Sequence, residues 1–455
     1  QVQATADQPA YSKIDRELVL GLDFGTSSVK VVFGDPAIGR SGKAFAVPFR
    51  SAEGLSGFLL PCRLYRSADT FSLTPEGLVF ADLKLALLAH PEADDNRLHV
   101  VAFLALAIRR ARAWLFTQHE AVYRSNNIIW RMAIGLPTAN HLEPEQADLF
   151  EQLGWAAWIL AGNDAEVITQ QLATTALSRA SHLRHGEAPT EQEDVEISVI
   201  PEIAAQIYGY VASEQFDPKA ANNFMMVDVG AGTVDTSLFQ VKRGSGGKWD
   251  FIFFTATVEP LGVVNLHRHR LNWWSTVIQD RCPDRVELLE AISEARLVSD
   301  TQTGLPEKLE DYFSAVSLVF TTPAQHADRL FYKKVFKQVA HETYWETSQG
   351  RLSRIDLTDL PVYLCGGGSR LPFYEQLRYS LNNHPSMYEW MRVKIRQLTK
   401  PNDLMAPGLP IADFDRLSVA YGLSFLDLGK VLKAVPKPEI PVTSSDAWRD
   451  NYIEK

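Results

Sequence analysis

Apolar stretches of two kinds alternate along most of the chain. Leu18–Phe24 and Val29–Gly34 are rich in apolar and β-branched residues, which predicts two β-strands. The apolar positions of Arg97–Gln118 recur with helical spacing, which predicts a helix. Because strands alternate with helices, the pattern favours an α/β fold.

The alternation continues towards the C-terminus. Ile128–Thr138 is interpreted as a buried strand halted by Pro137, and Glu145–Leu160 as a helix. Asp194–Glu202 is expected to form a strand that leads into another helix. Phe414–Leu432 is expected to form a single helix close to the end of the folded chain.

One pattern occurs twice, far apart in the sequence. In Gly21–Lys30 (GLDFGTSSVK), an apolar strand is followed by Asp23, a glycine and hydroxyl residues, and the same order returns around Asp228 in Met225–Val241 (MMVDVGAGTVDTSLFQV). Ser213–Asn223 separates the two copies as a boundary. We interpret the pattern as a divergent internal repeat and predict two similar lobes whose Asp-Gly hairpins face one another across a cleft.

These boundaries divide the chain into four parts. Residues 1–17 are an N-terminal lead-in, and residues 433–455 are a proline-rich tail that we expect to be extended or disordered. The first lobe comprises residues 18–212 together with 411–432, and the second lobe comprises residues 222–405.

The composition narrows the class of protein. With 46% hydrophobic and 22% charged residues, it is typical of a globular chain, and a formal charge of −10 argues against general nucleic-acid binding. Three scattered cysteines suit neither a disulfide framework nor a zinc site. The best apolar stretch, His99–Ile108, is too short to span a bilayer. We therefore expect a reducing, cytoplasmic location without direct nucleic-acid or membrane binding.

The two hairpins contain the residue types of an anion-binding site. Glycine in a tight turn permits positive φ, so that successive backbone N–H groups can point into one concavity, and hydroxyl groups add donors. An aspartate at the strand end can hold a hydrated Mg²⁺, which is commonly bound through one or two carboxylates plus substrate phosphates. Either hairpin alone is more simply a surface turn, whereas the two together indicate a clamp for a di- or triphosphate.

A third stretch, Pro361–Leu377 (PVYLCGGGSRLPFYEQL), joins an apolar strand to a helix through three glycines. The glycines would let the backbone approach a flat ring closely, and the guanidinium of Arg370 could stack on that ring. The alternative is an ordinary strand-to-helix turn with a solvated arginine.

At these three stretches the sequence resembles the actin, sugar-kinase and heat-shock-chaperone ATPase superfamily. GLDFGTSSVK, VDVGAGTVD and CGGGSR are similar to its phosphate-1, phosphate-2 and adenosine motifs. From Leu18 to Leu432 the chain most resembles the nucleotide-binding domain of DnaK-type chaperones. The resemblance implies a two-lobed actin-like ATPase fold with duplicated ribonuclease-H-like subdomains around a nucleotide cleft. The proline-rich tail shows no further strand pattern, so we expect an ATPase head without the chaperones' peptide-binding domain.

The resemblance also implies roles for individual residues around ATP or ADP and Mg²⁺. Asp23 and Asp228 would orient the waters of the bound Mg²⁺, and Thr233 and Asp235 would help to position the attacking water. The β- and γ-phosphates would be surrounded by Gly25, Thr26, Ser27, Ser28, Gly230, Ala231 and Gly232.

Two charged residues of the chaperones' cleft have counterparts here, each with an alternative interpretation. Glu202 corresponds to a catalytic-cleft glutamate, although a helix first-turn acid stabilised by the dipole is the alternative. Lys84 corresponds to a lysine that contacts the phosphates, and its alternative is a solvated helix lysine. Asp415 would lie near the ribose and phosphate site, and the adenosine would be lined by Gly366, Gly367, Gly368 and Arg370.

Three features depart from the chaperone pattern. Gly368 stands where the chaperones have a serine, and Ala231 replaces a glycine, which is tolerable if its φ is negative. Glu287–Ser299 could correspond to the adenine-contacting helix, through Glu290, Glu294 or Arg296, or could be a helix with a charged, solvated face.

The resulting hypothesis is an ATPase switch. ATP would close the two lobes, slow hydrolysis would reopen them, and an unidentified protein partner would read the state. A carbohydrate-type kinase is an alternative, because GLDFGTSSVK also resembles the opening of such enzymes, although no aspartate of a sugar pocket is identified. A filament-forming actin-like protein and a nucleotide-binding scaffold with little hydrolysis are the others.

Overall fold

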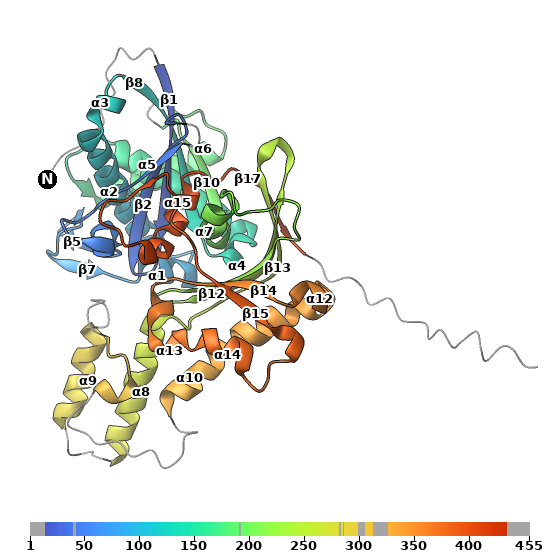
Figure 1. The fold of residues 1–455 in the computed structure, drawn as a ribbon. Helices are drawn as coiled ribbons and strands as arrows, with labels where there is room; N and C mark the ends of the chain where they lie inside the picture. Colours follow the sequence, from blue (N-terminus) through green and yellow to red (C-terminus); the bar gives the residue numbers. More distant parts are fainter. Residues whose placement is uncertain are drawn as a thin grey trace, which may run out of the picture.

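The computed structural model describes residues 14–39, 42–190, 193–281, 284, 286–298, 305–312 and 326–434. The fold is mixed α/β, with two large sheets and one small one (Figure 1). The first large sheet and its helices occupy the upper part of Figure 1, and the second large sheet lies below them with α8 and α9 at the bottom.

The first large sheet follows the order β10-β8-β1-β2-β3-β16, with β4 paired to β2. Strands β1 and β2 are antiparallel, whereas β8 runs parallel to both β1 and β10. Its strands are β1 (Ile14–Phe24), β2 (Ser28–Asp35), β3 (Lys43–Ala46), β4 (Leu60–Pro61), β8 (Asn126–Leu136), β10 (Glu196–Pro201) and β16 (Leu404–Met405). The helices of this part are α1 (Leu83–Ala89), α2 (Asp94–Gln118), α3 (Glu120–Tyr123), α4 (Thr138–His141), α5 (Pro144–Gly162), α6 (Gln170–Arg184), α7 (Glu202–Val211) and α15 (Ser418–Leu423).

The second large sheet follows the order β15-β14-β11-β12-β13-β17. Strands β11, β12 and β13 form an antiparallel meander. Strand β14 pairs in parallel with both β11 and β15, and β17 pairs in parallel with β13. Its strands are β11 (Asn223–Val229), β12 (Val234–Arg243), β13 (Trp249–Glu259), β14 (Leu360–Cys365), β15 (Val393–Arg396) and β17 (Leu428–Lys433). The helices are α8 (Val263–Arg281), α9 (Val286–Val298), α10 (Ala327–Phe336), a π-helical segment (Lys337–Trp345), α11 (Glu346–Ser348), α12 (Arg354–Leu357), α13 (Pro372–Glu375) and α14 (Leu377–Asn383).

A small antiparallel sheet, ordered β7-β5-β6-β9, borders the first large sheet. Its strands are β5 (Leu64–Ser67), β6 (Thr70–Ser72), β7 (Leu78–Phe80) and β9 (Ile168–Thr169). Single turns of 3-10 helix lie at Gly54–Phe58, Ser245–Gly247, Leu309–Tyr312, Gly367–Arg370, Glu389–Met391 and Ile411–Arg416.

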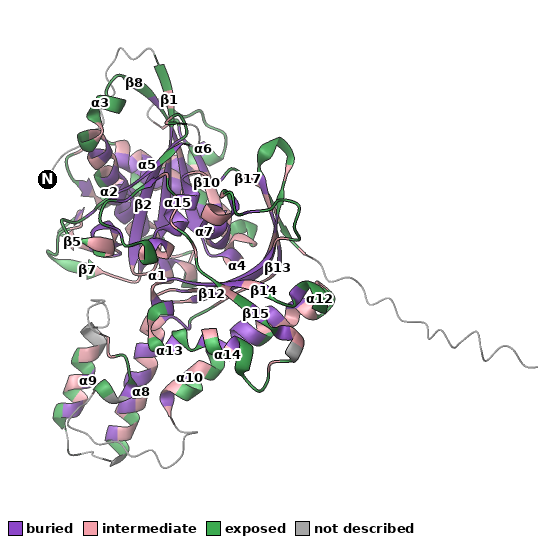
Figure 2. Ribbon diagram, in the orientation of Figure 1, coloured by how far each residue is buried: buried purple, intermediate pink, exposed green. Residues whose placement is uncertain are grey.

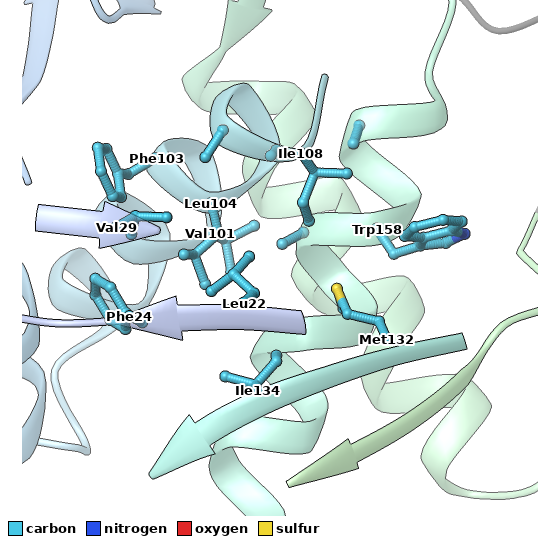
Figure 3. Packing of buried hydrophobic residues seen from close by; sticks show 14 of the residues in the cluster. Leu22, Phe24, Val29, Val101, Phe103, Leu104, Ile108, Met132, Ile134 and Trp158 are labelled. Atoms are coloured by element: carbon cyan, nitrogen blue, oxygen red, sulfur yellow. The ribbon is translucent and has the colours of Figure 1, made fainter. Parts of the chain in front are cut away.

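Alternate residues of the central strands face different layers of the core. Leu22 and Phe24 of β1 pack with Val101 of α2, Met132 of β8 and Trp158 of α5 in the largest apolar cluster (Figure 3). Figure 2 shows the buried residues concentrated in the strands of both large sheets and on the helix sides that cover them. This period of two is what places every second residue of β1 against α2 and α5.

Most elements predicted from the pattern are confirmed, but Phe414–Leu432 is not a single helix. Helix α15 ends at Leu423, and β17 then pairs with β13, with Leu428 opposite Trp249. The free edge of β13 offers hydrogen-bond partners that isolated helical spacing does not reveal, so tertiary pairing prevails over the local pattern.

The chain boundaries also differ from the predicted ones. Strand β1 begins at Ile14, inside the expected lead-in, and Lys433 of the expected tail belongs to β17. Strand β16 lies beside β3 in the first sheet, although residues 222–405 were assigned to the second lobe. Residues 1–13 and 435–455 lie outside the described residues.

Helices α7 and α15 touch backbone to backbone at Gly422. A Cβ at Gly422 would overlap the carbonyl oxygen of Ala205 in α7, and a Cβ at Gly21 of β1 would overlap that of Ala420. Helix α15 therefore packs against both α7 and β1 at a distance that only glycine permits.

We expect the substitution Gly422→Ala to lower the free energy of unfolding by about 1–3 kcal/mol, because the added methyl must push α7 and α15 apart. Urea unfolding followed by circular dichroism measures the change. Gly162→Ala is the matched control, because apart from its chain neighbours and the nearby backbone of its own helix no described atom lies within 4 Å of a Cβ placed at this last residue of α5. Equal stability of the two variants would contradict the close contact.

Candidate functional site

The first Asp-containing turn joins β1 to β2. Asp23 lies opposite Lys30 across the two strands, and the Lys30 ammonium contacts Asp23 Oδ2 at 3.0 Å, with both side chains buried. Between these strands, residues 25–27 form a turn that places its hydroxyl groups at the end of the sheet.

The second turn repeats this arrangement between β11 and β12. Asp228 lies directly opposite Asp235, and the N–H of Gly230 donates a hydrogen bond of 2.8 Å to the carbonyl of Thr233. The turn is therefore tight, and it brings two aspartates to the same end of the second sheet.

The glycines of these turns have different backbone angles from those predicted. Gly25, Gly230 and Gly232 do not have positive φ, so the expected left-handed nest is wrong. At least two of these positions need glycine because a side chain would not fit. A Cβ at Gly25 would lie 2.8 Å from the carbonyl oxygen of Ser28, and one at Gly232 would lie 2.8 Å from Leu85 Cδ1. Ala231 also lies outside the positive-φ region, which explains why alanine is tolerated there.

The glycine run after β14 reaches the second turn. Gly366 has a φ of +82°, and a Cβ there would overlap Asp228 Oδ1 and lie 2.5 Å from the carbonyl oxygen of Val229. A Cβ at Gly368 would lie 2.5 Å from Val229 Cγ1 and 2.6 Å from Val263 Cγ2. The departure from serine at Gly368 therefore has a steric cause in this chain.

Both turns and the glycine run border one cavity of about 430 Å³. Of the predicted site residues, Ser28, Gly232 and Arg370 are not part of its wall. The others all line it: Asp23, Gly25, Thr26, Ser27, Lys84, Glu202, Asp228, Gly230, Ala231, Thr233, Asp235, Gly366, Gly367, Gly368 and Asp415. The structure thus gathers residues from opposite ends of the sequence around one space.

A largely buried ion pair forms part of this cavity wall. Lys84 of α1 is 4% exposed, and its ammonium lies 2.5 Å from Glu202 Oε1 at the start of α7. The alternative of a solvated helix lysine is therefore wrong for Lys84. Glu202 does stand in the first turn of α7, so its position serves both the helix dipole and the ion pair.

Crowded carboxylates dominate the electrostatics of the cavity. Burial raises the pKa of Asp228 to about 6, with further contributions from Glu202 and Asp23. Burial and then Glu202 raise the pKa of Asp235 well above its ordinary value. Burial also raises the pKa of Glu202, and Lys84 opposes that rise. Negative charge is thus held in a confined space, where a bound cation would relieve the mutual repulsion.

Four residues that sequence reasoning missed complete the wall or support it. Gln206 donates a hydrogen bond of 3.0 Å to Asp228 Oδ2, and the Thr138 N–H donates one of 3.1 Å to Asp235 Oδ2. Lys30 pairs with Asp23, and the guanidinium of Arg416 lies where a Cβ at Gly367 would be. Gln206 was detectable, because it stands one helical turn after Glu202 on the same face of α7.

Arg370 lies outside the cavity wall, although the prediction placed its guanidinium against a ring beside the glycine run. Its guanidinium forms ion pairs with Asp413 and Asp415 and donates a hydrogen bond of 2.8 Å to the carbonyl of Ala412. These partners hold Arg370 outside the cavity wall. Burial raises the pKa of Asp415, and Arg370 and Arg416 counteract this effect.

The expected adenine-contacting helix is present as α9 (Val286–Val298), but neither Glu290 nor Glu294 lines the cavity. The side chain of Arg296 and residue Ser299 lie outside the described residues. Leu305 and Glu307, which follow α9 in the chain, line the cavity instead.

Metal-binding clusters and membrane-spanning helices are both absent from the described ranges. Across the described ranges, no three His, Cys, Asp or Glu side chains converge into a group that could hold a metal ion directly. Nor does any helix in that part of the chain have both the length and the apolar character needed to cross a membrane.

The chain was also compared with known proteins. No family model matches it, and no curated protein sequence matches it at a significant level. The side chains of the cavity are therefore the basis for inferring a function.

Proposed function

We propose that this chain is an ATPase of the two-lobed actin-like fold, similar to the nucleotide-binding domain of heat-shock chaperones. The two large sheets would be its duplicated ribonuclease-H-like subdomains, and the cavity of about 430 Å³ would be its nucleotide cleft. One observation supports this most strongly: Asp23 and Asp228, from equivalent turns that are remote in sequence, line the same cavity as the Gly366–Gly368 run.

The polar turns would bind the phosphates. Thr26, Ser27 and Thr233 supply hydroxyl donors at the two strand ends. Lys84 supplies the positive charge, and its ion pair with Glu202 holds the ammonium in place before the nucleotide arrives. The three glycines after β14 leave room for the adenosine, with Asp415 nearby.

The residues present fit a hydrated magnesium ion. Asp23, Glu202, Asp228 and Asp235 bring four carboxylates to the cavity against the ammonium groups of Lys30 and Lys84. Asp23 and Asp228 would hold the ion through its waters, because Mg²⁺ loses its hydration shell reluctantly. When bound, the ion would neutralise the charge on the transferred phosphoryl group.

Asp235 is placed to orient the attacking water. Its Oδ2 accepts the hydrogen bond from the Thr138 N–H, whereas its buried Oδ1 has no hydrogen-bond partner in the described part of the chain. That free oxygen can accept a hydrogen bond, and then the proton, from water. The raised pKa of Asp235 makes its carboxylate a stronger proton acceptor than an ordinary aspartate.

Helix α7 would transmit the nucleotide state to a protein partner. It carries Glu202 and Gln206, which contact Lys84 of α1 and Asp228 of β11 in the second large sheet. Bound ATP would favour the closed arrangement of these contacts, and hydrolysis would release it. The buried free thiols of Cys62 and Cys365 are compatible with the cytoplasmic location that we propose.

Phosphate release from Mg-ATP tests this proposal. We expect slow turnover by the purified protein without any added substrate, and its loss when EDTA removes the metal. ADP is quantified alongside phosphate, so that a one-to-one yield identifies hydrolysis. ATP binding without turnover would instead indicate a scaffold or a kinase that lacks its acceptor, and the absence of binding would refute the proposal.

A further inference from the structure

A second cavity, of about 470 Å³, adjoins the first. Thr26, Ser27 and Ala231 line both cavities, so the two spaces meet at the hydroxyl-rich turn after β1. The second cavity extends from there between the β4 region and the small sheet, where Leu60 and Tyr65 belong to its wall. It uses none of the carboxylates proposed to act on ATP.

Three arginines surround this second cavity, namely Arg50, Arg63 and Arg110. Among the described residues, none of the three has a carboxylate within ion-pair distance. Asp82 is the acidic residue in the wall, and Arg268 already pairs with it at 2.9 Å. The wall is therefore positively charged in a chain whose formal charge is −10.

Among the described residues, the side chains of these arginines have few hydrogen-bond partners. Nη2 of Arg63 is buried and finds no hydrogen-bond partner in the described ranges. Arg110 donates one hydrogen bond, to the carbonyl of Phe49, and lies close enough to Arg50 for their repulsion to add to burial in lowering its pKa. Gathering like charges without an anion costs free energy, which a bound anion would recover.

Ser28 provides a second, independent indication of a ligand. It is 1% exposed and lines this cavity, and its Oγ has no hydrogen-bond partner among the described residues. A buried hydroxyl without a partner is unusual in a folded protein and is readily explained by a ligand that supplies one.

The remaining wall sets the size and character of the ligand. Apolar side chains form part of it, namely Leu59, Leu60, Pro61, Leu73 and Pro75. The volume of about 470 Å³ lies within the range of small-molecule sites, about 300–1,000 Å³. Cys62 also lines the cavity, but burial raises its thiol pKa to about 12, and its Sγ donates to the carbonyl of Gly25 at 3.0 Å. The thiol therefore stays protonated and takes no part in charge recognition.

We propose that the second cavity binds a small molecule that carries a phosphate group, with Arg50, Arg63 and Arg110 around the phosphate and Ser28 as a further donor. The planar guanidinium fork matches two phosphate oxygens, and the three positive charges exceed the two negative charges of a phosphate dianion. The apolar wall accommodates the body of the molecule. Binding at this site does not depend on the proposed ATP hydrolysis.

Titration calorimetry with two probes, inorganic phosphate and glycerol 3-phosphate, tests this site. Each titration is run with and without the non-hydrolysable analogue adenylyl imidodiphosphate, which occupies the first cavity. We expect binding in both conditions, and at least about tenfold weaker binding in Arg63→Gln and in Arg110→Gln. The affinity of Arg63→Lys for the probes should lie between those of Arg63→Gln and the parent protein, because lysine keeps the positive charge but lacks the planar guanidinium fork.

Arg124→Gln is the control, since Arg124 directly follows α3, lies outside the cavity wall and is paired with Glu120. Circular dichroism of each variant establishes that it is folded. If glycerol 3-phosphate binds more tightly than inorganic phosphate, the ligand is a phosphorylated small molecule. If the two probes bind equally, the ligand is free phosphate. Both results support the site. Absence of binding by both probes, or unchanged affinity in folded Arg63→Gln and Arg110→Gln, would overturn it. If the ATP analogue itself fails to bind, the proposed function fails, and the phosphate titrations still decide the second cavity.

Discussion

Replacing Asp235 with asparagine is expected to lower the rate of ATP hydrolysis by about 10²–10⁴-fold, the usual contribution of a positioned general base. Asparagine keeps the shape of the side chain and can keep an oxygen for the Thr138 N–H, which donates to Asp235 at 3.1 Å. It cannot take a proton from water. Phosphate release under saturating Mg-ATP measures the loss, and fluorescence titration measures ATP affinity, which we expect to change little.

Stability separates loss of catalysis from loss of folding in this variant. Asp235 is buried, and burial raises its pKa well above its ordinary value, so its charged form is costly in the folded protein. Asparagine removes that cost, and the midpoint of thermal unfolding should be unchanged or higher. Asp427→Asn, an exposed residue paired with Lys248, is the control. Turnover at the parental rate in Asp235→Asn would remove Asp235 from the proposed mechanism.

The ion pair between Lys84 and Glu202 gives the second large expected effect. Lys84→Met should lower the free energy of unfolding by about 3 kcal/mol, because it leaves Glu202 buried among other carboxylates. Glu202→Gln should lower the free energy of unfolding by less, since the Lys84 ammonium is still attracted to the nearby carboxylate of Asp235. Both variants should lose ATP turnover, because the ammonium is either absent or no longer held in place.

A double-mutant cycle measures this coupling. The combination of Lys84→Met with Glu202→Gln should be more stable than the sum of the single changes predicts, by at least about 1 kcal/mol. Urea unfolding supplies the free energies. The exposed pair of Arg124 and Glu120, at the two ends of α3, is the matched control, and its coupling should be well below 1 kcal/mol. Additive effects at Lys84 and Glu202 would show that the short distance carries no functional interaction.

The sequence was sufficient to predict features that depend on neighbouring residues. The strands around Asp23 and Asp228 follow from short apolar runs that end in glycine and polar residues, and both form where expected. The strand that leads into the glycine run at Gly366 was also predicted, whereas the positive φ of Gly366 was not. Such signals act over a few residues, so the order of residue types is enough to identify them.

Features that depend on distant partners were predicted less well. Lys30 was not expected beside Asp23, and Arg370 was expected in the cavity wall although Asp413 and Asp415 hold it outside. Ser28 follows Ser27 directly, yet Ser27 lines both cavities whereas Ser28 lines the second cavity and not the first. No local pattern distinguishes these outcomes.

The sequence by itself determined the repeated strand–turn–strand units, the long helices and the residue types at their ends. Only the tertiary structure decided that residues 428–433 become the edge strand beside β13, that Lys84 lies 2.5 Å from Glu202, and that three arginines share one cavity. The physical reason is range: turn chemistry and periodicity are set by neighbours in the chain, whereas sheet-edge pairing, buried ion pairs and cavity walls are set by residues that meet only after the sheets have packed.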